Sequence, residues 1–190
     1  DDAETNDYYL TLSRLDWHKS VDDIVRAFDN LDATLVVAGD GPEREKLERM
    51  AGENVEFAGY VSESTKKELL AEARAFVFNG QDEDFGISPV EALAAGTPLI
   101  GVEEGMTQYQ IVDGKNGYSF ARDPSGTSIR EAVARFESEG VKWESGEIEE
   151  FADRFSVDAF HDRVRSAVWD AVQKSNTEPD WYSEISGSGK

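Results

Sequence analysis

Short apolar runs alternate along this chain with longer amphipathic stretches, and this alternation restricts the fold more than any other feature of the sequence. The apolar runs have the length of strands, and the stretches between them are long enough for helices. Strands that are joined by helical crossovers form a parallel sheet with helices packed on it. The sequence therefore predicts an α/β fold. The expected strands cover residues 8–13, 34–38, 55–58, 75–78, 99–102 and 117–120.

The size of the chain and its amphipathic stretches predict one helix-flanked domain. With 190 residues and a hydrophobic content of 39%, the chain can bury one sizeable core. We expect a single domain over residues 1–174, followed by a flexible C-terminal tail over 175–190, which is polar and rich in glycine and serine. Ser20, with Asp23 three residues later, resembles a capping box that would open the first helix. Helices are expected over residues 21–31, 42–51, 62–74 and 88–95, with two or three more between 125 and 174.

The chain is strongly acidic, with 40 acidic against 19 basic residues and a formal net charge of −21. Because the acids are spread along the whole chain, the charge belongs to the entire surface and disfavours nucleic acid as a partner. Repulsion between like charges destabilises a compact domain in dilute salt, but a Debye length of roughly 3 Å near 1 M salt screens it. We therefore expect a halophilic protein, the alternatives being an ordinary acidic protein or one that meets basic partners.

Two further absences narrow the classes of protein. The sequence has no cysteine, which excludes disulfides, thiolate metal sites and a cysteine nucleophile. It contains no run of about 18 apolar residues, and its first residues have neither a basic region nor an apolar run. We expect a cytoplasmic protein without a signal peptide or membrane span.

Two cations follow the first expected strand. In open parallel sheets, ligands bind beyond the carboxyl ends of the strands, so the residues after each strand are the first candidates for a site. Arg14 and Lys19 occupy this position and lead into a helix, where two cations can hold a diphosphate. The alternative is a pair of solvated surface cations.

Two glutamates, Glu83 and Glu91, bracket a glycine-containing turn and the start of a helix. Glu83 is expected in the loop and Glu91 two turns into the helix, so both can face one elongated, polyhydroxylated ligand, because carboxylates accept hydrogen bonds from hydroxyls. Between them, Phe85, Gly86 and Ile87 can expose backbone N–H groups where negative charge is favoured. We expect the two glutamates and the two cations to converge on one cleft, the alternative being that both glutamates are simply exposed.

Five segments in the same order resemble the carboxy-terminal domain of glycosyltransferase family four, the retaining "group one" enzymes with the B-type fold (GT-B). The resemblance covers about residues 8–120 and implies a Rossmann-like sheet that forms the donor-binding half of such an enzyme. The segments are Ser-Arg-Leu…Lys at 13–19, Gly-Asp-Gly-Pro-Glu at 39–43, Val-Glu-Phe-Ala-Gly-Tyr-Val at 55–61, residues 83–98, and Ile-Val-Asp-Gly-Lys-Asn-Gly at 111–117.

The resemblance implies transfer of a hexose-like sugar from a nucleoside diphosphate donor with retention of configuration. Arg14 and Lys19 would bind the diphosphate and stabilise the leaving nucleotide, a role that requires no metal or other cofactor. Glu91 would accept hydrogen bonds from the ribose, while Glu83 and the backbone of 85–87 would hold the sugar. The residues expected beside the base are Tyr60, Val61 and Ser62.

The sequence departs from the family pattern at three places. Ser20 stands where glycine is usual, Asn79-Gly80 replaces a common Pro-Ser, and Gln110 takes a position that is often glutamate. Serine at position 20 puts in doubt the turn after Lys19, and Asn79-Gly80 puts in doubt the path of the loop that leads to Glu83. The amide at position 110 puts in doubt an additional carboxylate in the site.

Enzymes of this fold use a second, N-terminal Rossmann-like domain that holds the acceptor, and the resemblance places none of it in this chain. We expect a shortened piece or a split-gene product that needs that domain as a partner, binds nucleotide weakly and transfers no sugar alone. Any association with a membrane is expected to be peripheral and to come through the missing half. The alternatives are a non-catalytic nucleotide-sugar-binding or assembly module, and an epimerase or phosphorylase of the same architecture.

Overall fold

The computed structural model describes residues 7–175. Contacts divide the chain into two compact units, Asp1–Ala152 and Asp153–Lys190, and each is described by itself. The domain expected over 1–174 therefore includes the first unit and part of the second. The tail expected over 175–190 lies outside the described residues, apart from the helical backbone of Ser175.

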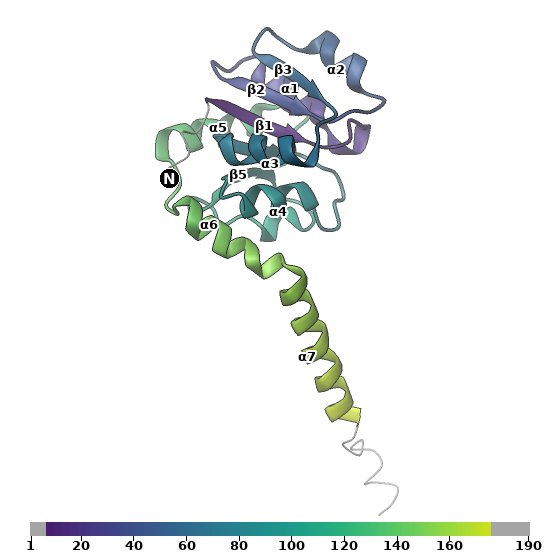
Figure 1. Ribbon diagram of the computed structural model, residues 1–190. Coiled ribbons are helices and arrows are strands. Elements are labelled where there is room, and N and C mark those ends of the chain that lie inside the picture. Colours follow the sequence, from purple (N-terminus) through teal and green to yellow (C-terminus); the bar gives the residue numbers. More distant parts are fainter. Residues whose placement is uncertain (1–6, 176–190) are drawn as a thin grey trace, which may run out of the picture. The chain divides into compact units, whose positions relative to one another are not determined.

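The first unit is built on a six-stranded sheet in which every neighbouring pair of strands is parallel (Figure 1). The strand order is β3-β2-β1-β4-β5-β6, so the chain moves outward from β1 to β3 and then returns to the other side of β1. This confirms the predicted α/β fold and creates a topological switch point between β1 and β4. The strands are β1 (Tyr8–Leu12), β2 (Thr34–Ala38), β3 (Val55–Gly59), β4 (Ala75–Phe78), β5 (Leu99–Val102) and β6 (Gly117–Phe120).

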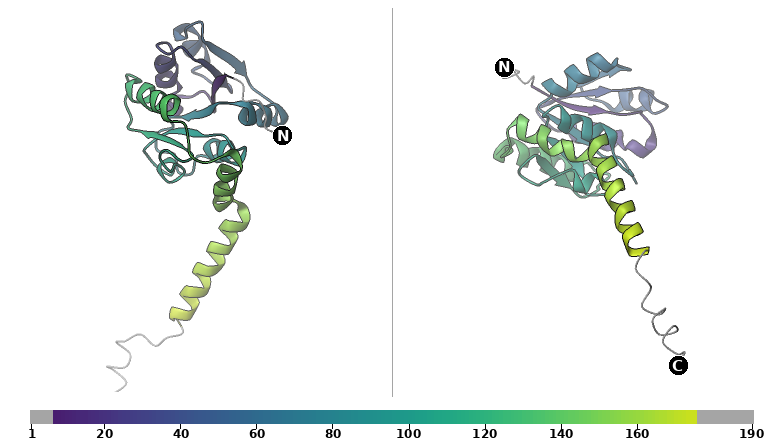
Figure 2. Two further views of the ribbon diagram at one scale, coloured as in Figure 1. Left: turned by 90° about the vertical axis from the view of Figure 1, so that its left-hand side faces the viewer. Right: turned by 60° about the horizontal axis from the view of Figure 1, so that its bottom comes forward.

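Helices cover both faces of the sheet (Figures 1 and 2). One face packs against α1 (Val21–Phe28), α2 (Arg44–Met50) and α5 (Thr127–Glu139). The other face packs against α3 (Glu63–Glu72), α4 (Ile87–Ala94) and α6 (Ser145–Ala152).

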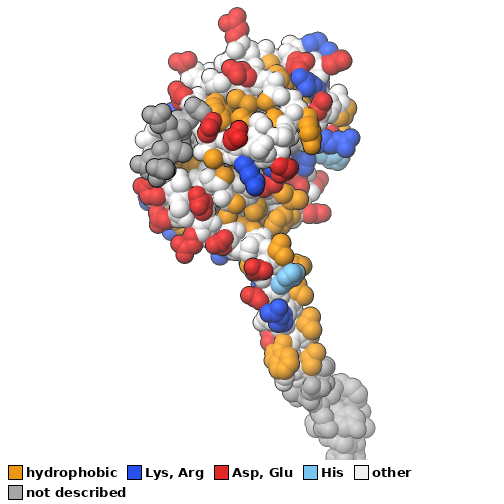
Figure 3. All heavy atoms as spheres, viewed as in Figure 1, with side chains coloured by type: hydrophobic (Ala, Val, Ile, Leu, Met, Phe, Trp, Pro, Cys, Tyr) orange, Lys and Arg blue, Asp and Glu red, His pale blue; other side chains and the backbone are white. Residues whose placement is uncertain are grey.

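The second unit contains a short 3-10 turn, η3 (Asp153–Phe155), and the long helix α7 (Val157–Ser175). Apolar side chains recur along α7 and are exposed, as the orange side chains along this helix in Figure 3 show. Between residues 7 and 175, no helix has both the length and the apolar character that are needed to cross a membrane. The exposed apolar residues of α7 are Val157, Phe160, Val164, Val168, Trp169 and Val172.

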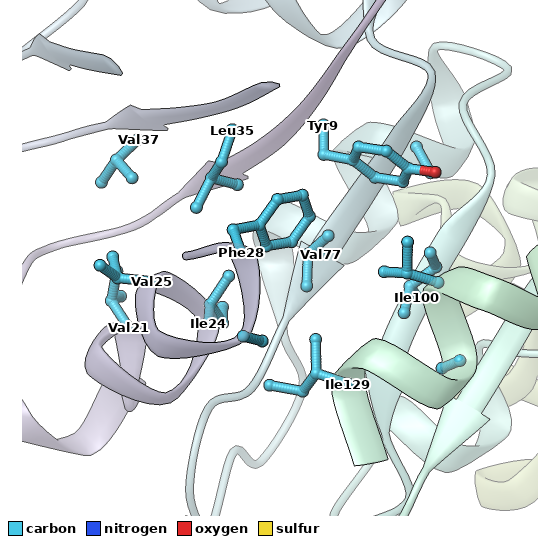
Figure 4. Close-up of a cluster of buried hydrophobic side chains, with 14 of the residues drawn as sticks. Tyr9, Val21, Ile24, Val25, Phe28, Leu35, Val37, Val77, Ile100 and Ile129 are labelled. Atoms are coloured by element: carbon cyan, nitrogen blue, oxygen red, sulfur yellow. The ribbon is translucent and has the colours of Figure 1, made fainter. Parts of the chain in front are cut away.

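The alternation of side chains along β1 gives the first unit two separate cores. Tyr9 faces the helices α1 and α5, where it packs with Phe28 and Phe136, while the next residue, Leu10, joins the cluster on the other face. Figure 4 shows Tyr9 and Phe28 together in the first cluster, with Ile129 nearby. All four residues of β4 are buried, which confirms the prediction of a central strand covered on both faces.

The predicted capping box at the start of α1 is wrong. Ser20 has a left-handed backbone, with φ of 45° and ψ of 39°, and its side chain makes no capping hydrogen bond. The reason is that Ser20 also ends the preceding 3-10 turn, η1 (Trp17–Lys19). Its hydroxyl instead accepts hydrogen bonds from Gln81 and Arg122. Glycine adopts such a left-handed backbone more readily than serine does.

Candidate functional site

A cavity of about 610 Å³ opens at the carboxyl edge of the sheet. The loops that follow β1, β2 and β3 line this cavity, together with the first turns of α3 and α4. The cavity therefore lies on the β1 side of the switch point. This is where open parallel sheets bind ligands. Its lining residues are Leu12, Ser13, Arg14, Gly39, Asp40, Gly41, Tyr60, Val61, Glu63, Lys66 and Ser88.

Two glycines allow the loops after β1 and β2 to touch beneath this cavity. A Cβ atom on Gly39, where φ is +121°, would lie 1.9 Å from the backbone oxygen of Ser13. A Cβ atom on Gly41 would lie 2.3 Å from the backbone oxygen of Leu15. A hydrogen bond of 2.9 Å from the amide of Leu15 to the carbonyl of Asp40 also joins the loops. The close approach fixes the backbone that carries the neighbouring Arg14.

Arg14 lines the cavity and is the most accessible of the predicted site residues with a charge. Its side chain is 76% exposed, and its Nε lies 3.9 Å from an oxygen of Asp16. A guanidinium that is this exposed is available to an anionic ligand, because a single distant ion pair holds it weakly.

Lys19 and Glu83 form an ion pair, in which Lys19 Nζ donates to Glu83 Oε2. Both side chains are about three-quarters buried. Gly105 packs against the backbone of Glu83, where a Cβ atom would lie 2.5 Å from the carbonyl oxygen. Among the described residues, neither Lys19 nor Glu83 lines the cavity, so this predicted cation and anion meet each other outside its lining.

Glu91 is connected to the cavity by a lysine that sequence reasoning missed. Lys66 lines the cavity, and its Nζ lies 2.6 Å from Glu91 Oε1 and 2.9 Å from Glu63 Oε2. The hydrogen bond to Glu91 is the main cause that raises the pKa of Lys66, and the bond to Glu63 adds to it. The spacing of Glu63 and Lys66 on the expected helix predicts their contact, but no local signal links Lys66 to Glu91, which lies 25 residues further on.

The loop before α4 is held by Gln110. Gly86 is the N-cap of α4, with φ of +72°, and no side chain caps the helix there. Gln110 is fully buried, and its Nε2 donates to the carbonyls of Phe85 at 2.5 Å and Gly86 at 3.4 Å. An ionised glutamate could not donate these bonds, which gives the amide at this position a physical reason. Phe85 and Ile87, beside Gly86, are 40% and 67% exposed.

Arg122, also missed from the sequence, connects the loops after β4 and β5. Its guanidinium donates to the carbonyl of Gly80 at 2.9 Å and binds both carboxylate oxygens of Glu104. Asn79 is buried, accepts from Arg122 and donates to Asp23 at 3.2 Å. Burial is the main cause that raises the pKa of Asp23. The Asn79-Gly80 sequence therefore holds this loop through polar contacts.

The three residues expected beside a base differ in their surroundings. Tyr60 and Val61 line the cavity, and Tyr60 is 86% exposed. Ser62 caps α3, since its Oγ accepts from the amide of Thr65 at 3.2 Å.

Within residues 7–175, no group of three or more histidine, cysteine, aspartate or glutamate side chains could hold a metal ion.

Comparison with known proteins identifies a family over most of the chain. The family described as "Glycosyl transferases group 1" matches residues 2–170. The GDP-mannose-dependent alpha-(1-6)-phosphatidylinositol dimannoside mannosyltransferase of Mycobacterium tuberculosis is 40% identical over 85 residues, 43% of this chain and 22% of that protein. Glycogen synthase from the same species is 32% identical over 128 residues, 62% of this chain and 31% of that protein.

Solved structures share the fold at low sequence identity. The lipopolysaccharide outer core galactosyltransferase WaaB aligns with a TM-score of 0.76 and 20% identity, over 90% of this chain and 50% of that one. Anabaena HepE, solved in complex with UDP and glucose, aligns with a TM-score of 0.73 and 18% identity, over 86% of this chain and 48% of that one. The chain thus spans about half of each structure and less than a third of each curated relative.

Proposed function

Because this chain belongs to the group 1 glycosyltransferase family, we propose that its cavity binds the nucleoside diphosphate part of a sugar donor. The names of similar proteins support a donor of this class: one relative is GDP-mannose-dependent, and HepE was solved with UDP and glucose. The two names carry different bases, so the family alone leaves the base open.

The observation that carries this proposal is the arrangement of opposite charges at the cavity. Arg14 stands exposed at the end of β1, where its guanidinium can bind a diphosphate through paired hydrogen bonds. Glu91, which Lys66 holds beside the cavity, can accept hydrogen bonds from the two ribose hydroxyls. A nucleoside diphosphate has these two groups next to each other.

We further propose that the Lys19–Glu83 pair acts on the transferred sugar. Glu83 would accept hydrogen bonds from sugar hydroxyls, while Lys19, with Arg14, would stabilise the negative charge that develops on the leaving nucleotide. The backbone at 85–87, at the start of α4, would favour the same negative charge. The transferred unit would be hexose-like, and its departure from the same face as the attack would retain the configuration. In this scheme the cations supply the electrostatic stabilisation, so no metal or other cofactor is needed.

A second Rossmann-like half would supply the acceptor site. We propose that this half is a domain or partner subunit outside the described residues, that the enzyme works in the cytoplasm, and that the present chain alone binds donor nucleotide without transferring sugar.

Titration calorimetry with UDP, GDP and ADP tests the site. Replacing Arg14 or Glu91 by alanine should weaken binding of the preferred nucleotide by about tenfold or more, since each removes charge-assisted hydrogen bonds. Arg49→Ala is the matched control, because Arg49 is 71% exposed on α2 and does not line the cavity. If none of the three nucleotides binds, or if Arg14→Ala and Glu91→Ala bind as tightly as the parent chain, the proposal is wrong.

A further inference from the structure

A second carboxylate faces the proposed nucleotide cavity beside Lys66. Glu63 is the first residue of α3 and lines the cavity with Tyr60 and Val61, at the end of β3. Its side chain is 82% exposed, although Lys66 Nζ lies 2.9 Å from Oε2. Glu63 is thus both positioned by a neighbour and open to a ligand.

The ammonium group of Lys66 contacts both Glu63 and Glu91. The positive charge of Lys66 offsets part of the negative charge of Glu63 and Glu91. This matters because Asp40 also lines the cavity, and uncompensated carboxylates would repel a diphosphate. If Glu91 binds the ribose, as in the proposed function on which this inference rests, Glu63 belongs to the wall formed by Tyr60 and Val61. The resemblance to group one glycosyltransferases implies that the base lies beside Tyr60 and Val61, which line the cavity together with Glu63.

The chemistry of a carboxylate distinguishes among bases. An ionised carboxylate only accepts hydrogen bonds, and its two oxygens suit two donors side by side. Guanine offers such a pair on its Watson–Crick edge, N1–H and N2–H. Uracil offers one N–H between two carbonyl oxygens, and adenine and cytosine each place a ring acceptor beside their amino group. With these three bases, a carboxylate would meet at least one repelling lone pair.

We propose that Glu63 is a specificity-determining residue that selects guanine, so that the donor is a guanosine diphosphate sugar. The exposed tip of Glu63 would accept from N1–H and N2–H, and the exposed ring of Tyr60 would lie beside the base. A site built on a ligand's donors rejects an analogue that lacks them, because its acceptor then loses water without gaining a partner.

Calorimetric titration of the full chain with GDP, UDP and ADP tests this inference, using Glu63→Gln as the variant. The parent chain should bind GDP at least about tenfold more tightly than UDP or ADP. Glu63→Gln should remove most of that preference while leaving the affinity for UDP within about threefold. Glu68→Gln is the control, because it removes the same charge from an exposed position on the same helix. Thermal unfolding of each variant shows whether α3 is intact.

The outcomes separate this inference from the proposed function. Equal affinity for the three nucleotides, or an equal loss for all three in Glu63→Gln, overturns guanine selection and leaves nucleotide binding in place. Tighter binding of UDP or ADP than of GDP overturns it as well. Failure of all three nucleotides to bind overturns the proposed function itself, and guanine selection with it.

Discussion

Lys66 Nζ on α3 lies 2.6 Å from Glu91 Oε1 on α4, although the two residues come from different crossovers of the sheet. This ion pair joins the helices that border the cavity and keeps Glu91 in place without leaving its charge uncompensated. It therefore gives the first prediction.

Replacing Lys66 by methionine should weaken the binding of GDP by about tenfold, since Glu63 and Glu91 would then repel the diphosphate. Part of the loss should be recovered in concentrated KCl, which screens repulsion between exposed charges. Calorimetry at low and high KCl measures both effects. Lys67→Met, which removes an adjacent exposed lysine, serves as the control. Equal losses in the two variants would contradict a specific role for Lys66.

Gly39→Ala should lower the free energy of unfolding by about 3 kcal/mol, because the added Cβ meets the backbone oxygen of Ser13 and the positive φ is strained. Gly146→Ala is the matched control. Gly146 lies in α6 with no atom within 4 Å of an added Cβ, so alanine there should raise stability by about 0.5–1 kcal/mol. Urea unfolding followed by circular dichroism compares the two. Similar effects of both substitutions would show that the loops after β1 and β2 are not in contact.

Gln110→Glu should destabilise the chain in a pH-dependent way. A glutamate at this buried position faces the carbonyls of Phe85 and Gly86, so its pKa should rise above the usual value of about 4.3. Only the protonated acid can donate to Phe85, so the loss of stability should be small below about pH 4. The loss should grow as the pH rises through the raised pKa, because the folded state then holds a buried charge.

Thermal unfolding of Gln110→Glu and the parent chain from pH 4 to 8 measures this difference. Gln108→Glu is the control, since Gln108 is exposed in the same segment. If the difference between Gln110→Glu and the parent chain does not change with pH, the buried amide is not the donor that holds the loop.

The unfolding temperature should rise between about 0.1 and 2 M KCl, because screening reduces repulsion in a chain with a net charge of −21. On the face shown in Figure 3, acidic side chains are spread across the first unit. Replacing the exposed Glu53 and Glu68 by lysine should reduce the dependence on salt. An unfolding temperature that is indifferent to KCl would show that the acidic composition is not an adaptation to salt.

Part of the candidate site was predictable from the sequence: Arg14 from its place after the first strand, and Tyr60 and Val61 from the resemblance to a known family. Arg14, Tyr60 and Val61 were predicted from the sequence and line the cavity. Lys19 and Glu83, predicted to share one cleft with Arg14 and Glu91, pair with each other outside the lining of the cavity. The donor roles of these residues stay predictions.

The sequence by itself determined the six strands, since their apolar runs are local patterns that burial in a parallel sheet requires; the fully buried β4 is the clearest case. The tertiary structure alone decided that Lys66 meets Glu91 and that Arg122 joins Gly80 to Glu104. The physical reason is the separation along the sequence over which each kind of interaction acts. Hydrophobic periodicity acts over neighbouring residues, whereas these polar contacts exist only after the crossovers have brought distant loops to one edge of the sheet.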